Sequence, residues 1–161
     1  MSSILSVYPG SVVRLELLVR VNTTALAEAA RAGATSLTVY DLTGYTAADS
    51  IVIEPSATPE LAPQEILTIS AATGHTITCA ATAFAHPKGT LVSRLIAATV
   101  TAQVELPDGT IVAGSVASVS TGRYRLDYTT AYVGTHVVEW AIAGTALGAG
   151  AYTFNVSDDL V

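Results

Sequence analysis

Apolar and polar residues alternate along much of this chain. Between residues 12 and 21 every odd position is apolar, whereas Arg14, Glu16 and Arg20 occupy even positions. A period of two is that of a β-strand with one buried face and one solvent-facing face. The pattern therefore predicts one strand over residues 12–21, with its apolar face turned towards a core.

Shorter runs rich in Val, Ile, Leu and Thr follow along the rest of the chain, and turn signals separate them. These signals are short Gly-containing sequences such as Thr73-Gly74 and Pro107-Asp108-Gly109. Short strands at this spacing are typical of an all-β protein of sandwich or barrel type. The further predicted strands are residues 37–40, 51–54, 65–70, 76–79, 90–95, 99–106, 110–112, 115–119, 123–128, 135–142 and 151–156.

The segment Thr24–Ala32 fits two structures. Its Ala-rich composition has high helix propensity, and Gly33 follows it as a stop signal. Against a helix, the segment is short for a self-standing one and carries no capping box. A short helix and an extended linker both remain open for this segment.

The predicted strands divide between two domains. Six of them fall between Thr99 and Val156, whereas an immunoglobulin-like (Ig-like) sandwich has about seven strands. The strand at 12–21 can supply the missing one. We therefore predict an all-β fold in which residues 1–21 and 95–161 form a discontinuous Ig-like β-sandwich, and residues 22–94 form an inserted small β-barrel or β-rich domain. A plain tandem of two β domains is the alternative.

Several loose motifs follow one another in a definite order. Tyr8-Pro9-Gly10 precedes the strand at 12–21, and the C-terminal part carries TVTAQVELPDGT from residue 99, TGRYRLDY from residue 121 and GTHVVEW from residue 134. This order resembles that of small Ig-like virion structural proteins of tailed bacteriophages. The middle of the chain, from AGATSLTV at residue 32 to HPKGTLV at residue 86, resembles a small β module that recurs in phage structural proteins.

Two features depart from that module. Ala48 stands before Asp49, where such modules often carry glycine, and the loop 54–64 is longer than usual and contains three prolines. The resemblance implies a structural role in a virion and leaves the position in the particle open.

Composition narrows the functional classes. The 161 residues include 27 Ala and 22 Thr, and only 12% are charged, about half the fraction usual in soluble domains. The net charge of −6, without any basic stripe, argues against nucleic acid as a partner. The single Cys79 excludes a disulfide within one chain. So few charges indicate a surface that other protein covers.

The sequence carries no pattern of a signal peptide or of a membrane span. Its first ten residues lack a basic start and a cleavage site. Two uncharged stretches, 66–87 and 140–157, are interrupted by Gly and polar residues. We expect a soluble protein that is made in the cytoplasm of a host bacterium, has no membrane partner and ends up in the virion.

Motifs of catalytic and metal sites are missing. His136 and Glu139 are three residues apart, so on a strand they face opposite sides. His75 and His86 adjoin predicted turns and are expected to be structural. No spacing matches a zinc site, a nucleophile elbow or a phosphate-binding loop. We therefore expect no enzyme activity, no cofactor, no metal and no small-molecule substrate.

Other notable side chains also have structural interpretations. Glu54, Glu60 and Glu65 lie on or beside the Pro-rich loop and are expected to be solvated, too widely spaced for a recognised calcium loop. Trp140 is expected in the sandwich core. The two tyrosines within residues 123–128 fit either a core or a contact surface.

Together these observations predict a non-enzymatic virion structural protein, in repeated copies in the neck (the head-to-tail connection) or tail of a tailed phage. A capsid decoration or cement protein and an exposed glycan-binding Ig-like module are the alternatives. The expected partners are copies of the chain itself and other virion proteins, namely a portal or connector, tail or major capsid protein. The N-terminal arm can add a strand to a neighbouring subunit, and its expected contact residues are Ile4, Leu5, Val7 and Tyr8.

Overall fold

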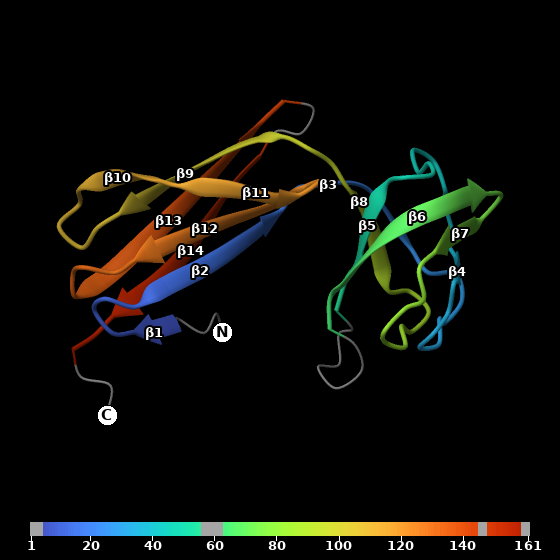
Figure 1. The fold of residues 1–161 in the computed structure, drawn as a ribbon, viewed down its shortest axis with the longest axis horizontal. Helices are drawn as coiled ribbons and strands as arrows, with labels where there is room; N and C mark the ends of the chain where they lie inside the picture. The colour runs from blue at the N-terminus through green and yellow to red at the C-terminus, as the bar shows by residue number, and fades with distance from the viewer. Residues whose placement is uncertain (1–4, 56–62, 145–147, 159–161) are drawn as a thin grey trace. The chain divides into compact units, whose positions relative to one another are not determined.

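A computed structural model describes residues 5–55, 63–144 and 148–158 (Figure 1). Within these ranges the chain forms fourteen β-strands and no helix, so the predicted all-β class is confirmed. The strands are β1 (Leu5–Val7), β2 (Val12–Leu18), β3 (Arg20–Ala25), β4 (Ser36–Thr38), β5 (Ser50–Ile53), β6 (Glu65–Thr73), β7 (Thr76–Cys79), β8 (Leu91–Leu95), β9 (Thr99–Glu105), β10 (Ile111–Gly114), β11 (Val116–Ser120), β12 (Arg123–Thr129), β13 (Gly134–Ala143) and β14 (Gly148–Val156).

The chain divides into two compact units. The central unit is Arg20–Ile96, and the terminal unit consists of the described residues up to Val19 together with those from Ala97 onward. The two ends of the chain therefore belong to one unit, and the middle of the sequence forms the other.

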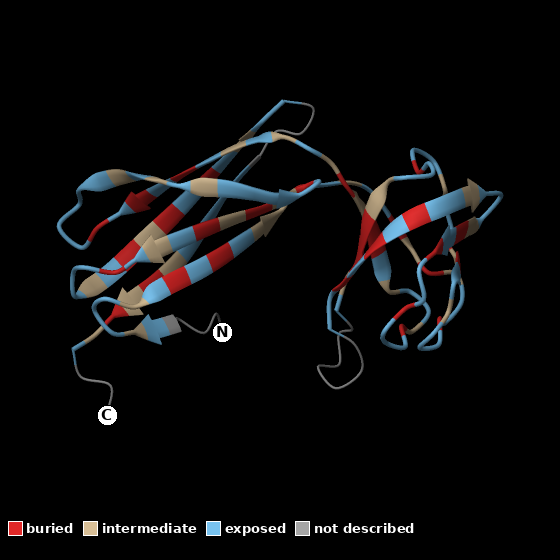
Figure 2. Ribbon diagram, in the orientation of Figure 1, coloured by how far each residue is buried: buried red, intermediate tan, exposed pale blue. Residues whose placement is uncertain are grey.

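The terminal unit contains two sheets that share one core. One sheet has the strand order β1-β14-β13-β9-β10, and the other has the order β11-β12-β2. Buried and exposed residues alternate along these strands (Figure 2). The buried side chains of both sheets meet in a single apolar cluster, because a sheet with one apolar face must cover that face with another layer. Its buried members include Val13, Leu126, Val138, Trp140 and Phe154.

The central unit is built on one sheet with the order β3-β8-β5-β6-β7-β4. An antiparallel bridge joins Leu26, just after β3, to Val39, just after β4. The first and last strands of the order are thereby connected to each other as well. The apolar cluster of this unit includes Leu26, Leu37, Ile51, Ile69 and Ile77, each at most 1% exposed.

The prediction of one strand over residues 12–21 is wrong. β2 ends at Leu18 and pairs with β12, whereas β3 begins at Arg20 and pairs with β8. Val19 lies between them, and its N–H donates to the carbonyl of Gly122 at 2.8 Å. The alternation of apolar residues continues across this break, so the period of two does not reveal that the chain leaves one sheet for another.

The helical alternative for residues 24–32 is also wrong. β3 runs to Ala25, and the next residues form isolated antiparallel bridges, Leu26 with Val39 and Ala30 with His86. Helix propensity amounts to a few tenths of a kcal/mol per residue. Pairing with strands elsewhere in the unit, together with burial of Leu26 and Ala30, outweighs it.

Candidate functional site

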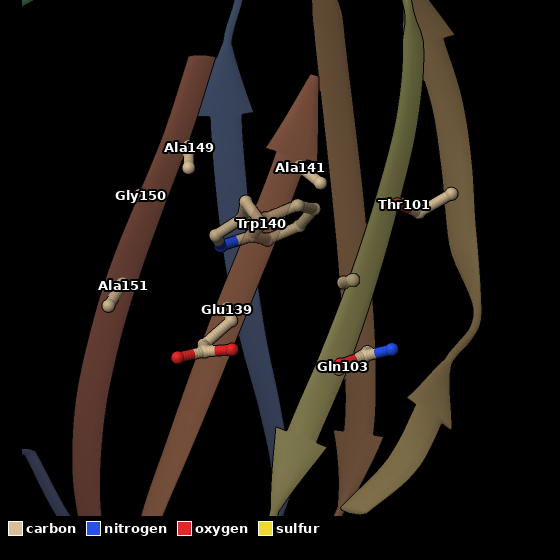
Figure 3. Close-up of a pocket in the computed structure, with 9 residues that line it drawn as sticks. Thr101, Gln103, Glu139, Trp140, Ala141, Ala149, Gly150 and Ala151 are labelled. Carbon is tan, nitrogen blue, oxygen red and sulfur yellow. The ribbon is translucent and has the colours of Figure 1, made fainter. Parts of the chain in front are cut away.

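A hollow of about 480 Å³ lies on the outer face of the five-stranded sheet of the terminal unit (Figure 3). Strands β9, β13 and β14 form its floor, and their side chains in it are mostly small. The residues lining it are Thr101, Ala102, Gln103, Glu139, Trp140, Ala141, Ala149, Gly150 and Ala151.

Strand alternation explains the shape of this hollow. Glu139 and Ala141 are exposed, whereas Trp140 between them is 5% exposed and belongs to the core. The outer face therefore carries the small side chains, and the large ring packs on the inner side. Gly150 pairs with Trp140 across β13 and β14, so it contributes only backbone to the outer face.

The lining residues carry few side chains that could act as an acid, a base or a nucleophile. Glu139 is the one ionisable side chain among them. General acid–base catalysis of glycoside hydrolysis needs two carboxyl groups, and nucleophilic catalysis needs a base beside the nucleophile. The other side chains of the lining are those of Ala, Thr, Gln and Trp.

Metal-binding groups do not gather in the part of the chain that the structure describes. No three His, Cys, Asp or Glu side chains lie in an arrangement that could hold a metal ion there. Cys79 is buried, and burial raises the pKa of its thiol, so the thiol stays protonated at neutral pH. The same residues include no helix long and apolar enough to cross a membrane.

The predicted assembly residues lie at one edge of the terminal unit. Leu5–Val7 form β1, which runs parallel to β14 of the same chain, with Leu5 beside Phe154 and Val7 beside Val156. The N–H of Ser157 donates to the carbonyl of Val7 at 3.0 Å. Ile4 lies outside the described residues. The addition of this strand to a neighbouring subunit stays a prediction.

Tyr8 is the fourth predicted contact residue. It follows β1, and 48% of its surface is exposed. Its carbonyl accepts a hydrogen bond from Oγ1 of Thr130 at 2.8 Å. The Tyr8 backbone is thus held to the segment between β12 and β13, and its side chain remains accessible.

The aromatic residues of the terminal unit turn mostly inward. Trp140 is in the core, as the sequence predicted. Tyr124 is 6% exposed, and its hydroxyl donates to the carbonyl of Ala98 and accepts from the Ala98 N–H, both at 2.7 Å. Tyr128 packs against the core beside the rings of His136 and Phe154. The core interpretation is confirmed for Tyr124, and Tyr128 is half-buried against the core cluster.

His136 and His75 lie where the sequence placed them, and the expected structural role of His86 is described below. His136 is fully buried on β13, with its ring stacked on Phe154 at 5.0 Å between centroids, and Glu139 is exposed on the opposite face. His75 is exposed in the turn between β6 and β7.

His86 forms a pair that sequence reasoning missed. Its Nε2 atom lies 2.8 Å from Oε2 of Glu65, and Glu65 is 9% exposed. The expectation that Glu65 is a solvated loop residue is therefore wrong. The sequence held one signal: Glu65 falls in step with Leu67 and Ile69, both buried, so alternation places it on the core face of β6.

Glu54 differs from expectation as well. It comes directly after β5, and Oε1 of its carboxylate lies 2.5 Å from Nη1 of Arg20. Its side chain is 19% exposed, so it is an ion-paired residue rather than a solvated one. Glu60 lies outside the described residues.

Comparison with known proteins gives no family assignment. No family model matches the chain, and a search of curated proteins finds no match.

Proposed function

We propose that this protein is a non-enzymatic structural subunit of a tailed-phage virion, present in repeated copies in the neck or tail. In this proposal the terminal unit is an Ig-like sandwich and the central unit is a small inserted barrel. The two sheets around one core support the first assignment. The bridge between Leu26 and Val39, which connects the outermost strands, supports the second.

The observation that carries this proposal is the nearly uncharged outer face of the five-stranded sheet. Glu139 is the one charged residue among those that line its hollow, and the others are Ala, Gly, Thr, Gln and Trp. Covering such a face removes little charge from water, and the centres of protein interfaces are depleted in charged residues. In a symmetric assembly the same contact is repeated between many copies, so each contact can be weak while the assembly as a whole is stable.

The glycan-binding alternative receives less support. Sugar-binding sites use exposed aromatic rings, and the sequence offers Tyr40, Tyr45 and Phe84 in the central unit. Tyr45 is 6% exposed, whereas Tyr40 and Phe84 are 56% and 40% exposed. Lys88 lies over the Tyr40 ring, with Nζ 5.9 Å from its centroid. Of the three rings, one is therefore buried and a second has a cation over it, which leaves Phe84 for stacking on a sugar.

Copies per particle, counted by quantitative mass spectrometry of purified virions, test the proposal. A neck or tail ring requires about six to a few dozen copies, whereas a capsid decoration protein requires hundreds. Absence of the protein from purified particles would overturn the virion assignment. Turnover of a polysaccharide or peptide by the purified protein, lost on substitution of a carboxylate, would overturn its non-enzymatic character.

Deletion of residues 1–7 tests the predicted role of the N-terminal arm. The shortened protein is expected to fold, because the arm contributes only a three-residue edge strand to the described structure, but to fail to enter particles. Normal incorporation would show that the arm makes no essential assembly contact, while the virion assignment itself would stand.

A further inference from the structure

We infer that two copies of this chain pair through β10, the edge strand of the five-stranded sheet, antiparallel and about a two-fold axis at Val112. Backbone groups of Ile111 and Ala113 make the contact. The inference goes beyond the proposed function, because it assigns a second copy of the chain as the partner of one edge, wherever the protein acts. Three features of the terminal unit support it.

The first feature is that the free side of β10 has no neighbour in the terminal unit. β10 pairs with β9, and no other described strand pairs with it (Figure 1). β1 is four strand positions away, about 19 Å at the usual spacing. Residues 1–4, which precede β1 outside the described ranges, span at most about 14 Å. Residues 159–161 follow β14, about 14 Å from β10, and span at most about 11 Å.

Residues 145–147 are the remaining part of this unit that lies outside the described ranges. They connect β13 to β14 after Gly144. β10 lies beside the stretch of β9 that pairs with Val137–Trp140, so Trp140 is the last residue of β13 that is level with β10. The connection from Gly144 onward is therefore both two strand positions away and past the end of β10.

The second feature is the direction of the backbone groups of β10. In an antiparallel pair, residues that exchange hydrogen bonds with the partner strand alternate with residues that do not. The N–H of Leu106 donates to the carbonyl of Thr110 at 2.8 Å where β9 and β10 meet, so the next bonded position on β10 is Val112. Ile111 and Ala113 lie on either side of Val112. Their N–H and C=O groups therefore point away from β9, to the free side.

These two donors and two acceptors are complementary to themselves. When a second copy is turned about a two-fold axis at Val112, Ile111 of each copy lies opposite Ala113 of the other. Each of these two pairs exchanges two hydrogen bonds, so the contact contains four. A register that places Ile111 opposite Ile111, or Ala113 opposite Ala113, gives two. The register centred on Val112 is the one that pairs every free donor and acceptor.

The third feature is that the side chains of β10 permit this approach. The strand, Ile-Val-Ala-Gly, has no charged residue, no proline and no register shift against β9, and these are usual devices that protect an edge strand from pairing. The edges of the other sheet carry such devices: charged Arg14 and Glu16 on β2, and a register shift on β11. Ile111 is 60% exposed, and in the dimer it lies beside Ala113 of the second copy.

A proline at position 113 tests the backbone contact. Ala113→Pro removes an N–H that points to the free side and leaves the hydrogen bonds between β9 and β10 in place, and edge strands tolerate proline in this orientation. Ala113→Val is the matched control, because it keeps the N–H and adds a side chain that suits a strand. Analytical ultracentrifugation measures association, and circular dichroism verifies that each variant is folded.

Wild type and Ala113→Val are expected to form dimers that dissociate on dilution. Ala113→Pro is expected to associate at least about tenfold more weakly, because two of the four hydrogen bonds between the copies are lost. Wild type that stays monomeric up to its solubility limit would overturn the inference. Folded Ala113→Pro that dimerises as tightly as wild type would overturn it as well.

A cross-linking experiment tests the register and leaves all the hydrogen bonds in place. In the dimer the two Val112 residues lie directly opposite each other, with Cα atoms about 4.5 Å apart, which suits a disulfide. The two Ala113 residues lie diagonally, about 7–8 Å apart, which does not. Val112→Cys is therefore expected to form a covalent dimer on oxidation at least about tenfold faster than Ala113→Cys, although Ala113 is the more exposed residue.

Wild type is the blank of this experiment, because its single thiol, Cys79, is buried. Cross-linking of Ala113→Cys as fast as that of Val112→Cys would contradict the two-fold register and overturn the inference. None of these results depends on whether the protein is found in virions. Particle composition, counted as described above, tests the proposed function separately.

Discussion

The Nε2 atom of His86 lies 2.8 Å from Oε2 of Glu65, and both side chains are buried in the central unit. The other carboxylate oxygen of Glu65 accepts the N–H of Ala83 at 2.6 Å. Glu65 begins β6, and Ala83 and His86 lie in the loop between β7 and β8. One carboxylate thereby holds this loop to the start of a strand about twenty residues away in sequence.

Replacement of Glu65 by Ala should destabilise the central unit by about 3–5 kcal/mol, because it leaves the buried His86 ring and the Ala83 N–H without their acceptor. Urea unfolding of the full chain, followed by circular dichroism, measures the loss. Glu28→Ala serves as the control, since Glu28 is exposed, and should change stability by no more than about 0.5 kcal/mol. A loss for Glu65→Ala as small as that of the control would contradict a structural role for the pair.

Replacement of Ala48 by Gly should stabilise the protein by about 0.5–1 kcal/mol. Ala48 has φ of +72°, a left-handed conformation that costs a residue with a Cβ about 1–2 kcal/mol, part of which the greater flexibility of unfolded glycine offsets. Its N–H donates to the carbonyl of Ile69 at 2.8 Å, which holds the backbone in place. A rise in melting temperature verifies this prediction.

The neighbouring substitution, Ala47→Gly, is the matched control. Ala47 is exposed and is not among the residues with positive φ, so glycine there should lower the melting temperature. If both substitutions lower the melting temperature, the left-handed backbone of Ala48 does not measurably reduce the stability of the folded protein.

Replacement of Tyr45 by Phe should lower stability at neutral pH and remove part of its alkaline pH dependence. The Tyr45 hydroxyl donates to the carbonyl of Val92 at 2.8 Å and also contacts the carbonyl of Asn22. Leaving these carbonyls unpaired should cost about 1–2 kcal/mol. Burial raises the pKa of Tyr45 to about 12.

The sign of the pH effect follows from that raised pKa. The folded chain keeps the Tyr45 proton in a range where the unfolded chain, with a pKa near 10, loses it. Stability contributed by Tyr45 is therefore complete below about pH 10 and falls as the pH rises towards 12. Urea midpoints at pH 8, 10 and 11 should fall less steeply for Tyr45→Phe than for wild type. The exposed Tyr40 supplies the control, Tyr40→Phe, which should retain the wild-type slope.

Replacement of Gly134 by Ala should destabilise the terminal unit by about 2–4 kcal/mol. Its φ is +122°, and a Cβ there would lie 2.8 Å from Cβ and 2.9 Å from Cγ of Pro107. Gly144→Ala is the control, because φ is similar at +114° but nothing lies within 4 Å. Fluorescence of Trp140, the single tryptophan, follows unfolding of this unit. Equal losses for the two variants would mean that the Pro107 contact relaxes without cost.

The sequence predicts this structure well where information is local. The burial of Val13 and Leu15, with Arg14 and Glu16 exposed, follows directly from alternation. The same alternation hides the break at Val19, because a strand that changes sheets can keep its period. Pairing partners lie far apart in sequence and are selected by packing, so the pair of His86 and Glu65 has no spacing signature.

The sequence by itself determined the all-β class, the side chains that face a core and most of the turns, because each depends on a few neighbouring residues. Only the tertiary structure decided that β2 and β3 belong to different sheets and that Glu65 is buried against His86. Both depend on partners that lie far apart in sequence, and those partners are set by three-dimensional packing rather than by neighbouring residues.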